Sequence, residues 1–151
     1  MRSLNLTAVV LTVIALMPGA AHVFELPGKL SLPQQDYFIV QQIYRGWAWF
    51  GTVIIAAGLV DLVLTILTSR RGGVFHLHAL ALIAVTGSLI VFFVWVYPAN
   101  QATENWAVVP ADWGSLRRQW EYGHMAAASL MFVALCSSLI ALYRSDDPVR
   151  S

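Results

Sequence analysis

Residues 74–97, VFHLHALALIAVTGSLIVFFVWVY, contain no Asp, Glu, Lys or Arg and decide the fold class of this chain. A helix needs roughly 20 apolar residues to cross about 30 Å of hydrocarbon, and this stretch is long enough. Residues 3–24 and 122–143 are equally free of these charges, and residues 46–69 contain one, Asp61. We therefore predict an all-α fold, a four-helix up-down transmembrane bundle with helices near 4–24, 46–69, 74–97 and 117–143.

The composition supports a membrane protein and excludes several other classes. Of the 151 residues, 58% are hydrophobic and 11% charged, and the mean hydropathy is +0.67. Soluble globular domains carry about 25% charged residues, so this chain is neither a soluble enzyme nor a disordered segment. A net charge of +1 excludes a nucleic-acid partner. Residues 1–151 form one integral membrane domain, and a single cysteine, Cys136, excludes an intrachain disulfide.

The basic residues indicate how the bundle is oriented. Residues 69–73, SRRGG, predict a tight turn between antiparallel second and third helices. One side of the membrane would then hold five arginines and the other side four basic residues. We place the larger group and both termini in the cytoplasm, in a bacterial-type inner or plasma membrane. The first group is Arg2, Arg70, Arg71, Arg144 and Arg150, and the second is Lys29, Arg45, Arg117 and Arg118.

The first apolar stretch has a second interpretation. Arg2, an apolar run and the small residues 19–21 also match a secretory signal peptide. Cleavage after Ala21 would make His22 the amino terminus, where the amine and the imidazole could together chelate copper. The length of the apolar run favours a retained helix.

A short helix is expected outside the membrane core. Residues 31–33, SLP, match a helix start, and Asp36 lies where the helix dipole favours an acid. Aromatic residues follow at helical spacing as far as Tyr44 and Trp47, which predicts an interfacial amphipathic helix running into the second span. Residues 98–116 form a long connection whose tryptophans we expect in the headgroup region.

Two carboxylate–imidazole pairs point to a site near the outer leaflet. His22 and Glu25 close the first helix, and Glu121 and His124 open the fourth, each pair three residues apart on one helix face. At 1.5 Å per residue, both histidines lie roughly 27–28 Å from the cytoplasmic boundary. Four such side chains are enough ligands for one Zn, Fe, Mn or Cu ion with an open coordination position.

The same residues allow two other interpretations. In an electrostatic clasp, the glutamates pair with Arg45, Arg117 or Arg118 and the histidines form hydrogen bonds at the headgroup level. In an acid–base or anion site, they act without a metal. The cofactor is therefore either one metal ion or none.

Polar residues at the cytoplasmic side form a separate group. Asp61 lies about 12 Å inside the boundary and His78 about 9 Å inside, so we predict a structural contact between them across the helix hairpin, with a proton relay as the alternative. His76 lies on a different helix face from His78 and cannot share its ligand.

Three short motifs resemble the anthrone-oxygenase-like family of small four-helix membrane proteins. They are residues 18–22, PGAAH, residues 98–100, PAN, and Trp113 followed by residues 117–124, RRQWEYGH. The resemblance implies an oxygenase that converts a reduced polycyclic aromatic carbon to a quinone. Carried over by position, the site residues are His22, Asn100, Arg117, Trp120 and His124, with Glu121 beside them. Residues 24–44 are longer than in a minimal member.

The residues and the resemblance together predict an outer-leaflet site for a lipophilic aromatic or quinone-like substrate. His124 or Glu121 would remove a proton, and Arg117 and Asn100 would stabilise the enolate oxygen. We expect Trp47, Trp106, Trp120, Tyr44 and Arg45 to contact the substrate.

Two functions from other classes fit the same sequence. The first is a non-catalytic membrane scaffold or assembly partner whose polar residues only hold helix ends together. The second is a haem-binding or quinone-binding electron carrier with His22 and His124 as axial ligands. Expected partners are membrane lipid, a lipophilic small molecule, and a second copy or another membrane protein.

Overall fold

The computed structural model describes residues 1–145, and all regular secondary structure in that range is helical, with no strand. Arg150, which the sequence places on the cytoplasmic side, lies outside the described residues. Six α-helices are joined by two short 3-10 segments, η1 (Gln42–Tyr44) and η2 (Trp47–Trp49), and by one π-helical segment, η3 (Phe92–Val96). The α-helices are α1 (Arg2–Ser31), α2 (Gln34–Gln41), α3 (Phe50–Leu67), α4 (Gly72–Val91), α5 (Tyr97–Ala102) and α6 (Trp113–Ser145).

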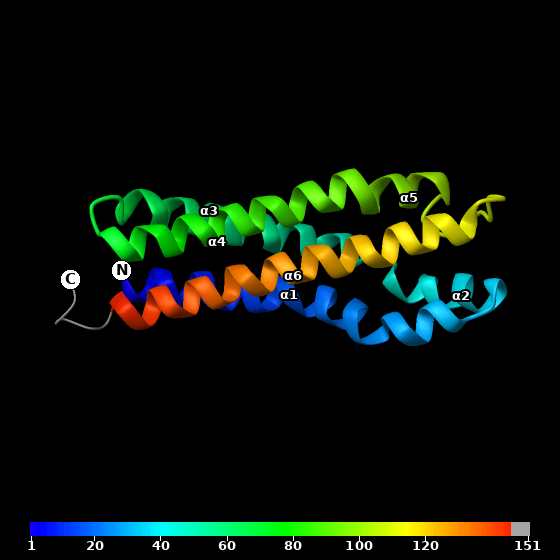
Figure 1. Ribbon diagram of the computed structural model, residues 1–151, viewed down its shortest axis with the longest axis horizontal. Helices are drawn as coiled ribbons and strands as arrows, with labels where there is room; N and C mark the ends of the chain where they lie inside the picture. Colours follow the sequence, from blue (N-terminus) through cyan, green and yellow to red (C-terminus); the bar gives the residue numbers. More distant parts are fainter. Residues whose placement is uncertain (146–151) are drawn as a thin grey trace.

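The four long helices lie side by side in one elongated bundle (Figure 1). Helix α1 packs against α3 and α6, and α4 packs against the same two helices on the other side of the core. One end of the bundle holds Met1, the α3–α4 turn and the last residues of α6; we call it the N/C end. The other end holds α2 and the α5–α6 connection; we call it the α2 end.

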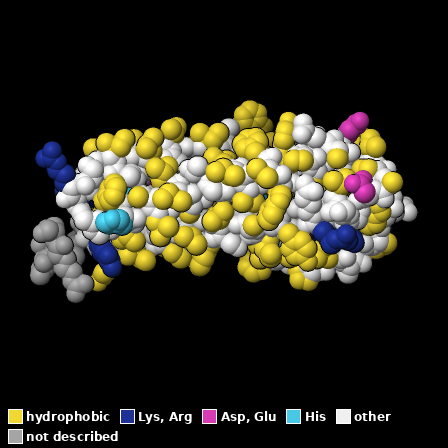
Figure 2. All heavy atoms as spheres, turned by 45° about the horizontal axis from the view of Figure 1, so that its top comes forward, with side chains coloured by type: hydrophobic (Ala, Val, Ile, Leu, Met, Phe, Trp, Pro, Cys, Tyr) yellow, Lys and Arg dark blue, Asp and Glu magenta, His cyan; other side chains and the backbone are white. Residues whose placement is uncertain are grey.

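Four segments are long and apolar enough to cross a membrane, as predicted. Figure 2 shows hydrophobic side chains along the body of the bundle and charged side chains near its two ends. This distribution is the one that a bilayer requires, because unpaired charges are costly in hydrocarbon. The four segments are Arg2–Ser31, Trp47–Leu67, Gly72–Ala102 and Trp113–Ser145.

The helices are longer than the charge-free stretches, and this corrects the predicted boundaries. Helix α1 continues beyond residue 24 and through Pro27 to Ser31, because its charged residues find partners inside the fold. The third span continues through η3 and α5 to Ala102, and α6 begins at Trp113.

The amphipathic segment is helical, but it does not run continuously into the second span. Helix α2 ends at Gln41, and Gly46 adopts φ +87° before η2 begins. This left-handed conformation suits glycine and turns the chain sharply toward α3.

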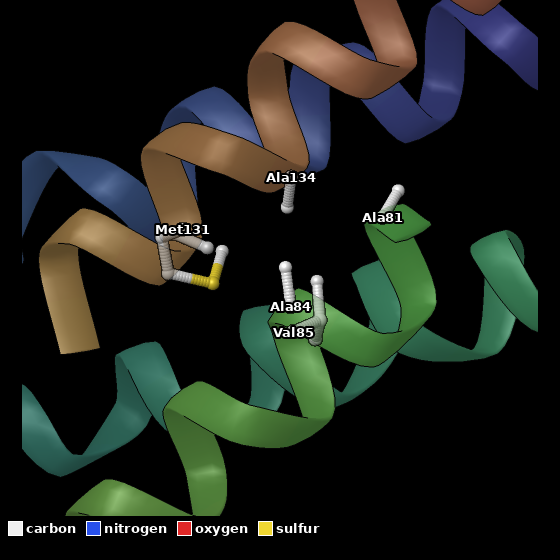
Figure 3. Packing of buried hydrophobic residues seen from close by; sticks show 6 residues of the cluster. Ala81, Ala84, Val85, Met131 and Ala134 are labelled. Atoms are coloured by element: carbon white, nitrogen blue, oxygen red, sulfur yellow. The ribbon is translucent and has the colours of Figure 1, made fainter. Parts of the chain in front are cut away.

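Small residues let the helices approach closely at the centre of the bundle. Ala15, Ala81, Ala84, Val85, Met131 and Ala134 form one buried cluster, part of which is shown in Figure 3. A Cβ atom on Gly19 would lie 3.1 Å from that of Ala128, so α1 and α6 are close to their limit of approach. Packing of this kind, through small side chains, is how helices associate in lipid.

The predicted contact between Asp61 and His78 is wrong, because the two side chains form no hydrogen bond. Both side chains are 0% exposed, yet neither carboxylate oxygen and neither ring nitrogen has a hydrogen-bond partner among residues 1–145. His76 is exposed at the N/C end, and its Nδ1 lies 2.9 Å from the Gly72 carbonyl oxygen.

Close packing at the α2 end makes Gly123 a sensitive position. A Cβ there would lie 2.8 Å from Val96 Cγ2 and 3.3 Å from Trp95 Cβ, whereas one at Gly114 of the same helix would meet nothing within 4 Å. We expect Gly123→Ala to lower stability by about 1–3 kcal/mol through overpacking. Gly114→Ala is the matched control and should leave the melting temperature in detergent unchanged or slightly raised. Equal melting temperatures for the two variants would contradict the close contact.

Candidate functional site

A cavity of about 780 Å³ lies in the half of the bundle toward the α2 end. Its walls come from α1, from the chain between η1 and the first turns of α3, from α4 with η3 and α5, and from α6. The volume is in the range of sites that hold drug-sized molecules, and most of the lining side chains are apolar or aromatic. We call it the His cavity because His22 and His124 both line it.

The two histidines meet on the wall of this cavity. Their ring centroids are 4.2 Å apart, although His22 comes from α1 and His124 from α6. The Trp120 ring lies 4.8 Å from His22 and 4.3 Å from His124, and the Tyr44 ring lies 4.6 Å from His22. The end of the first span and the start of the last therefore bring two imidazoles into one aromatic group.

A buried lysine lies behind the histidines. The Lys29 Nζ atom is 3.0 Å from Glu121 Oε2, 3.5 Å from Glu25 Oε2 and 3.2 Å from His22 Nδ1, and the side chain is 4% exposed. An ammonium group can only donate, so His22 Nδ1 accepts this hydrogen bond and the ring proton lies on Nε2. Lys29 thereby orients the His22 ring and sets its tautomer.

Two tyrosines complete the polar layer. The Tyr37 hydroxyl, in α2, donates to Glu121 Oε1 at 2.9 Å, and the Tyr44 hydroxyl, in η1, donates to Glu25 Oε2. Burial and the adjacent Glu121 carboxylate raise the pKa of Tyr37 well above its ordinary value, and burial and Glu25 do the same for the pKa of Tyr44. Both phenols therefore remain donors over the physiological range.

Irregular backbone shapes the far side of the cavity. The π-helical turn η3 places Phe92 and Phe93 on the cavity wall, and such turns inside α-helices are frequent at functional sites. Glu104, Asn105 and Trp106 have φ values of 47°, 56° and 64°, a conformation that costs each non-glycine residue roughly 1–2 kcal/mol. The turn buries the Trp106 side chain and brings it to the cavity.

The structure brings most of the predicted site residues together. Asn100 lines the cavity, and its Oδ1 accepts a hydrogen bond from Trp120 Nε1 at 2.8 Å. The predicted residues that line the cavity are His22, Tyr44, Arg45, Trp47, Asn100, Trp106, Trp120 and His124.

Three predicted site residues lie outside this lining. Glu25 and Glu121 are held behind it by Lys29. Arg117 donates from Nη1 to the Leu32 carbonyl at 2.9 Å, and its guanidinium stacks 4.7 Å from the Trp113 ring centroid. Arg117 therefore binds the end of α1 in this structure and does not face a substrate in the cavity.

The four predicted metal ligands do not form a metal site here. Among residues 1–145, no group of three or more His, Cys, Asp and Glu side chains is arranged to hold an ion. The two carboxylates bind Lys29 and the tyrosines, and Glu25 Oε2 is 4.0 Å from His22 Nδ1. An ammonium group at the centre of the set repels a metal cation, so the donor set does not fit one.

Sequence reasoning missed Lys29 and Tyr37 as site residues. His22, Glu25 and Lys29 are spaced by three and four residues, which places them on one face of any helix that extends to residue 31. That signal was obscured because the first helix was expected to end before Pro27. Nothing local in the sequence connects Tyr37 with Glu121.

Comparisons of this chain with known protein families, with curated proteins and with solved structures find no match.

The position of Lys29 predicts strong coupling to Glu121. Replacing Lys29 by Met leaves a buried carboxylate without its cation, which should cost about 3 kcal/mol and lower the melting temperature by roughly 6–12 °C. In the double variant Lys29→Met/Glu121→Gln both charges are gone, so most of this loss should be recovered. Thermal unfolding of the wild type, Lys29→Met, Glu121→Gln and the double variant in detergent completes the cycle. Independent, additive effects would show that the two side chains do not interact.

Proposed function

We propose that the protein is an integral membrane oxidoreductase that acts on a lipophilic aromatic or quinone-like molecule in the His cavity. Its chain would cross the bilayer four times, up and down, with the N/C end in the cytoplasm and the α2 end at the outer leaflet. The observation that carries the proposal is the pair of imidazoles 4.2 Å apart on the wall of an aromatic cavity of about 780 Å³.

The cavity walls favour a flat apolar ligand. Trp47, Trp106 and Trp120 line it together with Tyr44 and further aromatic side chains, and aromatic faces stack on planar rings. The position of the cavity near one end of the spans would let such a ligand enter laterally from the bilayer. Asn100 and Arg45 supply donors for a carbonyl or phenolic oxygen of the ligand.

The imidazoles suit proton abstraction from the bound molecule. His22 Nδ1 is occupied by Lys29, so its Nε2–H is the group available to donate, whereas His124 can accept through a ring nitrogen. We assign His124 as the base and His22 as a donor to the developing oxyanion. Asn100, whose amide oxygen is held by Trp120, would donate its N–H to the same oxyanion.

The reaction that these groups support is oxygenation of an activated methylene group. His124 removes one proton from carbon, the carbanion adds to dioxygen, and protonated His124 returns the proton to give a hydroperoxide. Loss of the second proton from the same carbon then breaks the O–O bond and leaves a ketone and water. One dioxygen is reduced, one of its oxygen atoms stays on the carbon, and the other leaves as water. The chain needs only its own side chains for the proton transfers.

A non-catalytic scaffold is the second candidate, because Lys29 also acts as a clasp. Its contact with Glu121 joins α1 to α6, and its contacts with His22 and Glu25 lie within α1. Tyr37 binds Glu121 and Tyr44 binds Glu25, which attaches α2 and η1 to the same group. A haem carrier is less well supported. Two axial imidazoles on one iron, with bonds of roughly 2 Å each, would hold their ring centroids about 6 Å apart, farther than the 4.2 Å here.

Oxygenation of anthrone, a tricyclic ketone with an acidic methylene group, tests the proposal. Purified protein in detergent should form the quinone and consume dioxygen, and His124→Gln should lower the rate by about 10²-fold or more. His76→Gln is the matched control, because His76 is exposed at the N/C end, and it should leave the rate unchanged. Product is followed by chromatography and dioxygen by an electrode.

Binding measurements separate the enzyme from the scaffold. A small naphthoquinone should quench tryptophan fluorescence in the wild type, and Trp120→Leu should weaken the quenching. If neither quenching nor turnover occurs while Lys29→Met still unfolds at a lower temperature, the scaffold function stands and the oxidoreductase is rejected.

A further inference from the structure

Four buried polar side chains without partners occur at the N/C end of the bundle, one on each long helix. Asn5 on α1, Asp61 on α3, His78 on α4 and Ser138 on α6 are each 1% exposed or less. Within the described part of the chain, the amide nitrogen and oxygen of Asn5, both Asp61 oxygens, both His78 nitrogens and the Ser138 hydroxyl have no hydrogen-bond partner. Buried polar groups nearly always have partners, so this concentration requires an explanation.

Contacts between the helices show that the four residues lie at similar depth. The Ser88 hydroxyl of α4 contacts Met131 Sδ of α6 at 3.3 Å. His78 lies 10 residues before Ser88 on α4, and Ser138 lies 7 residues after Met131 on the antiparallel α6. The two therefore differ in depth by three residues, or about 4.5 Å.

The other helix pairs give the same result. Gly58 packs on Val85, and Asp61 and His78 then differ by four residues in depth, or about 6 Å. Gly19 packs on Ala128, which likewise places Asn5 and Ser138 about 6 Å apart in depth. On one common scale the three counts spread the four residues over five residues of helix, or about 7.5 Å, from Asp61 to Asn5, so each helix contributes one buried polar group to this layer of the core.

We propose that these four side chains form a binding site for one sodium ion in the core of the bundle. The Asp61 carboxylate supplies one negative charge, which a single monovalent cation neutralises. Asn5 Oδ1 and Ser138 Oγ are neutral oxygen ligands of the kind that hard cations prefer. His78 completes the layer as a nitrogen ligand or as a donor to the second Asp61 oxygen.

The chemistry of the layer distinguishes this ion from others. A divalent ion would leave a net positive charge in the core, because the layer holds one carboxylate. Transition metals favour several imidazole or thiolate ligands, and this layer has one imidazole and no cysteine. The site is independent of the His cavity, since it lies at the opposite end of the bundle and shares no residue with it.

Thermal unfolding in matched salts tests the sodium site. Purified protein in detergent is melted in sodium chloride, potassium chloride and N-methyl-D-glucamine chloride at equal ionic strength and equal pH. We expect sodium to raise the melting temperature of the wild type by about 3–6 °C over the other two salts, because an ion that binds only the folded state stabilises it. Asp61→Asn should abolish the difference, and Asp36→Asn, at an exposed position of α2, should preserve it.

Two further variants test the site even if Asp61→Asn does not fold. Ser138→Ala and Asn5→Leu keep the carboxylate and remove one oxygen ligand each, so the sodium-dependent shift should move to concentrations at least several-fold higher. Identical melting temperatures of the wild type in the three salts would overturn the proposal. So would a sodium shift that survives undiminished in Asp61→Asn, because the ion would then bind elsewhere.

Discussion

The α2 end of the molecule depends on one buried ammonium group, that of Lys29. It lies within 3.5 Å of Glu25, Glu121 and His22, and these three side chains come from two helices distant in sequence. Removing such charges from water is expensive, and the cost is recovered only when the partners are close and their remaining lone pairs are bonded. Tyr37 and Tyr44 provide those bonds, so α2 is held by Glu121 of α6 and η1 by Glu25 of α1, the two carboxylates that share Lys29.

This polar layer also fixes one wall of the His cavity. Lys29 takes one nitrogen of His22, which leaves the rest of the ring to pack against Tyr44, Trp120 and His124. Groups whose own partners are fixed make better sites than mobile ones, because a ligand then meets them already in position. A clasp and a reaction site are compatible here, since the clasp lies behind the wall and the imidazoles lie on it.

The two ends of the bundle differ in how their buried charged groups are paired. At the α2 end, Lys29 binds Glu25, Glu121 and His22, and the two carboxylates also bind tyrosines. At the N/C end, Asn5, Asp61, His78 and Ser138 are buried in regular helix, and their polar atoms lack partners among the described residues. Small apolar residues pack the centre of the bundle between the two ends. Their side chains separate one polar layer from the other.

The sequence by itself determined the number of long helices and the apolar stretch at the centre of each, because a bilayer admits only apolar segments of a certain length. It also predicted that His22 and His124 lie at one depth, since helix rise converts residue number into height. Only the tertiary structure decided that Lys29 enters the site, that Arg117 turns to the end of α1, and that Asp61 and His78 form no hydrogen bond. Those outcomes depend on which faces of the packed helices meet. They also depend on whether a helix continues past a proline because its charged residues find buried partners. Residue spacing along the chain encodes neither.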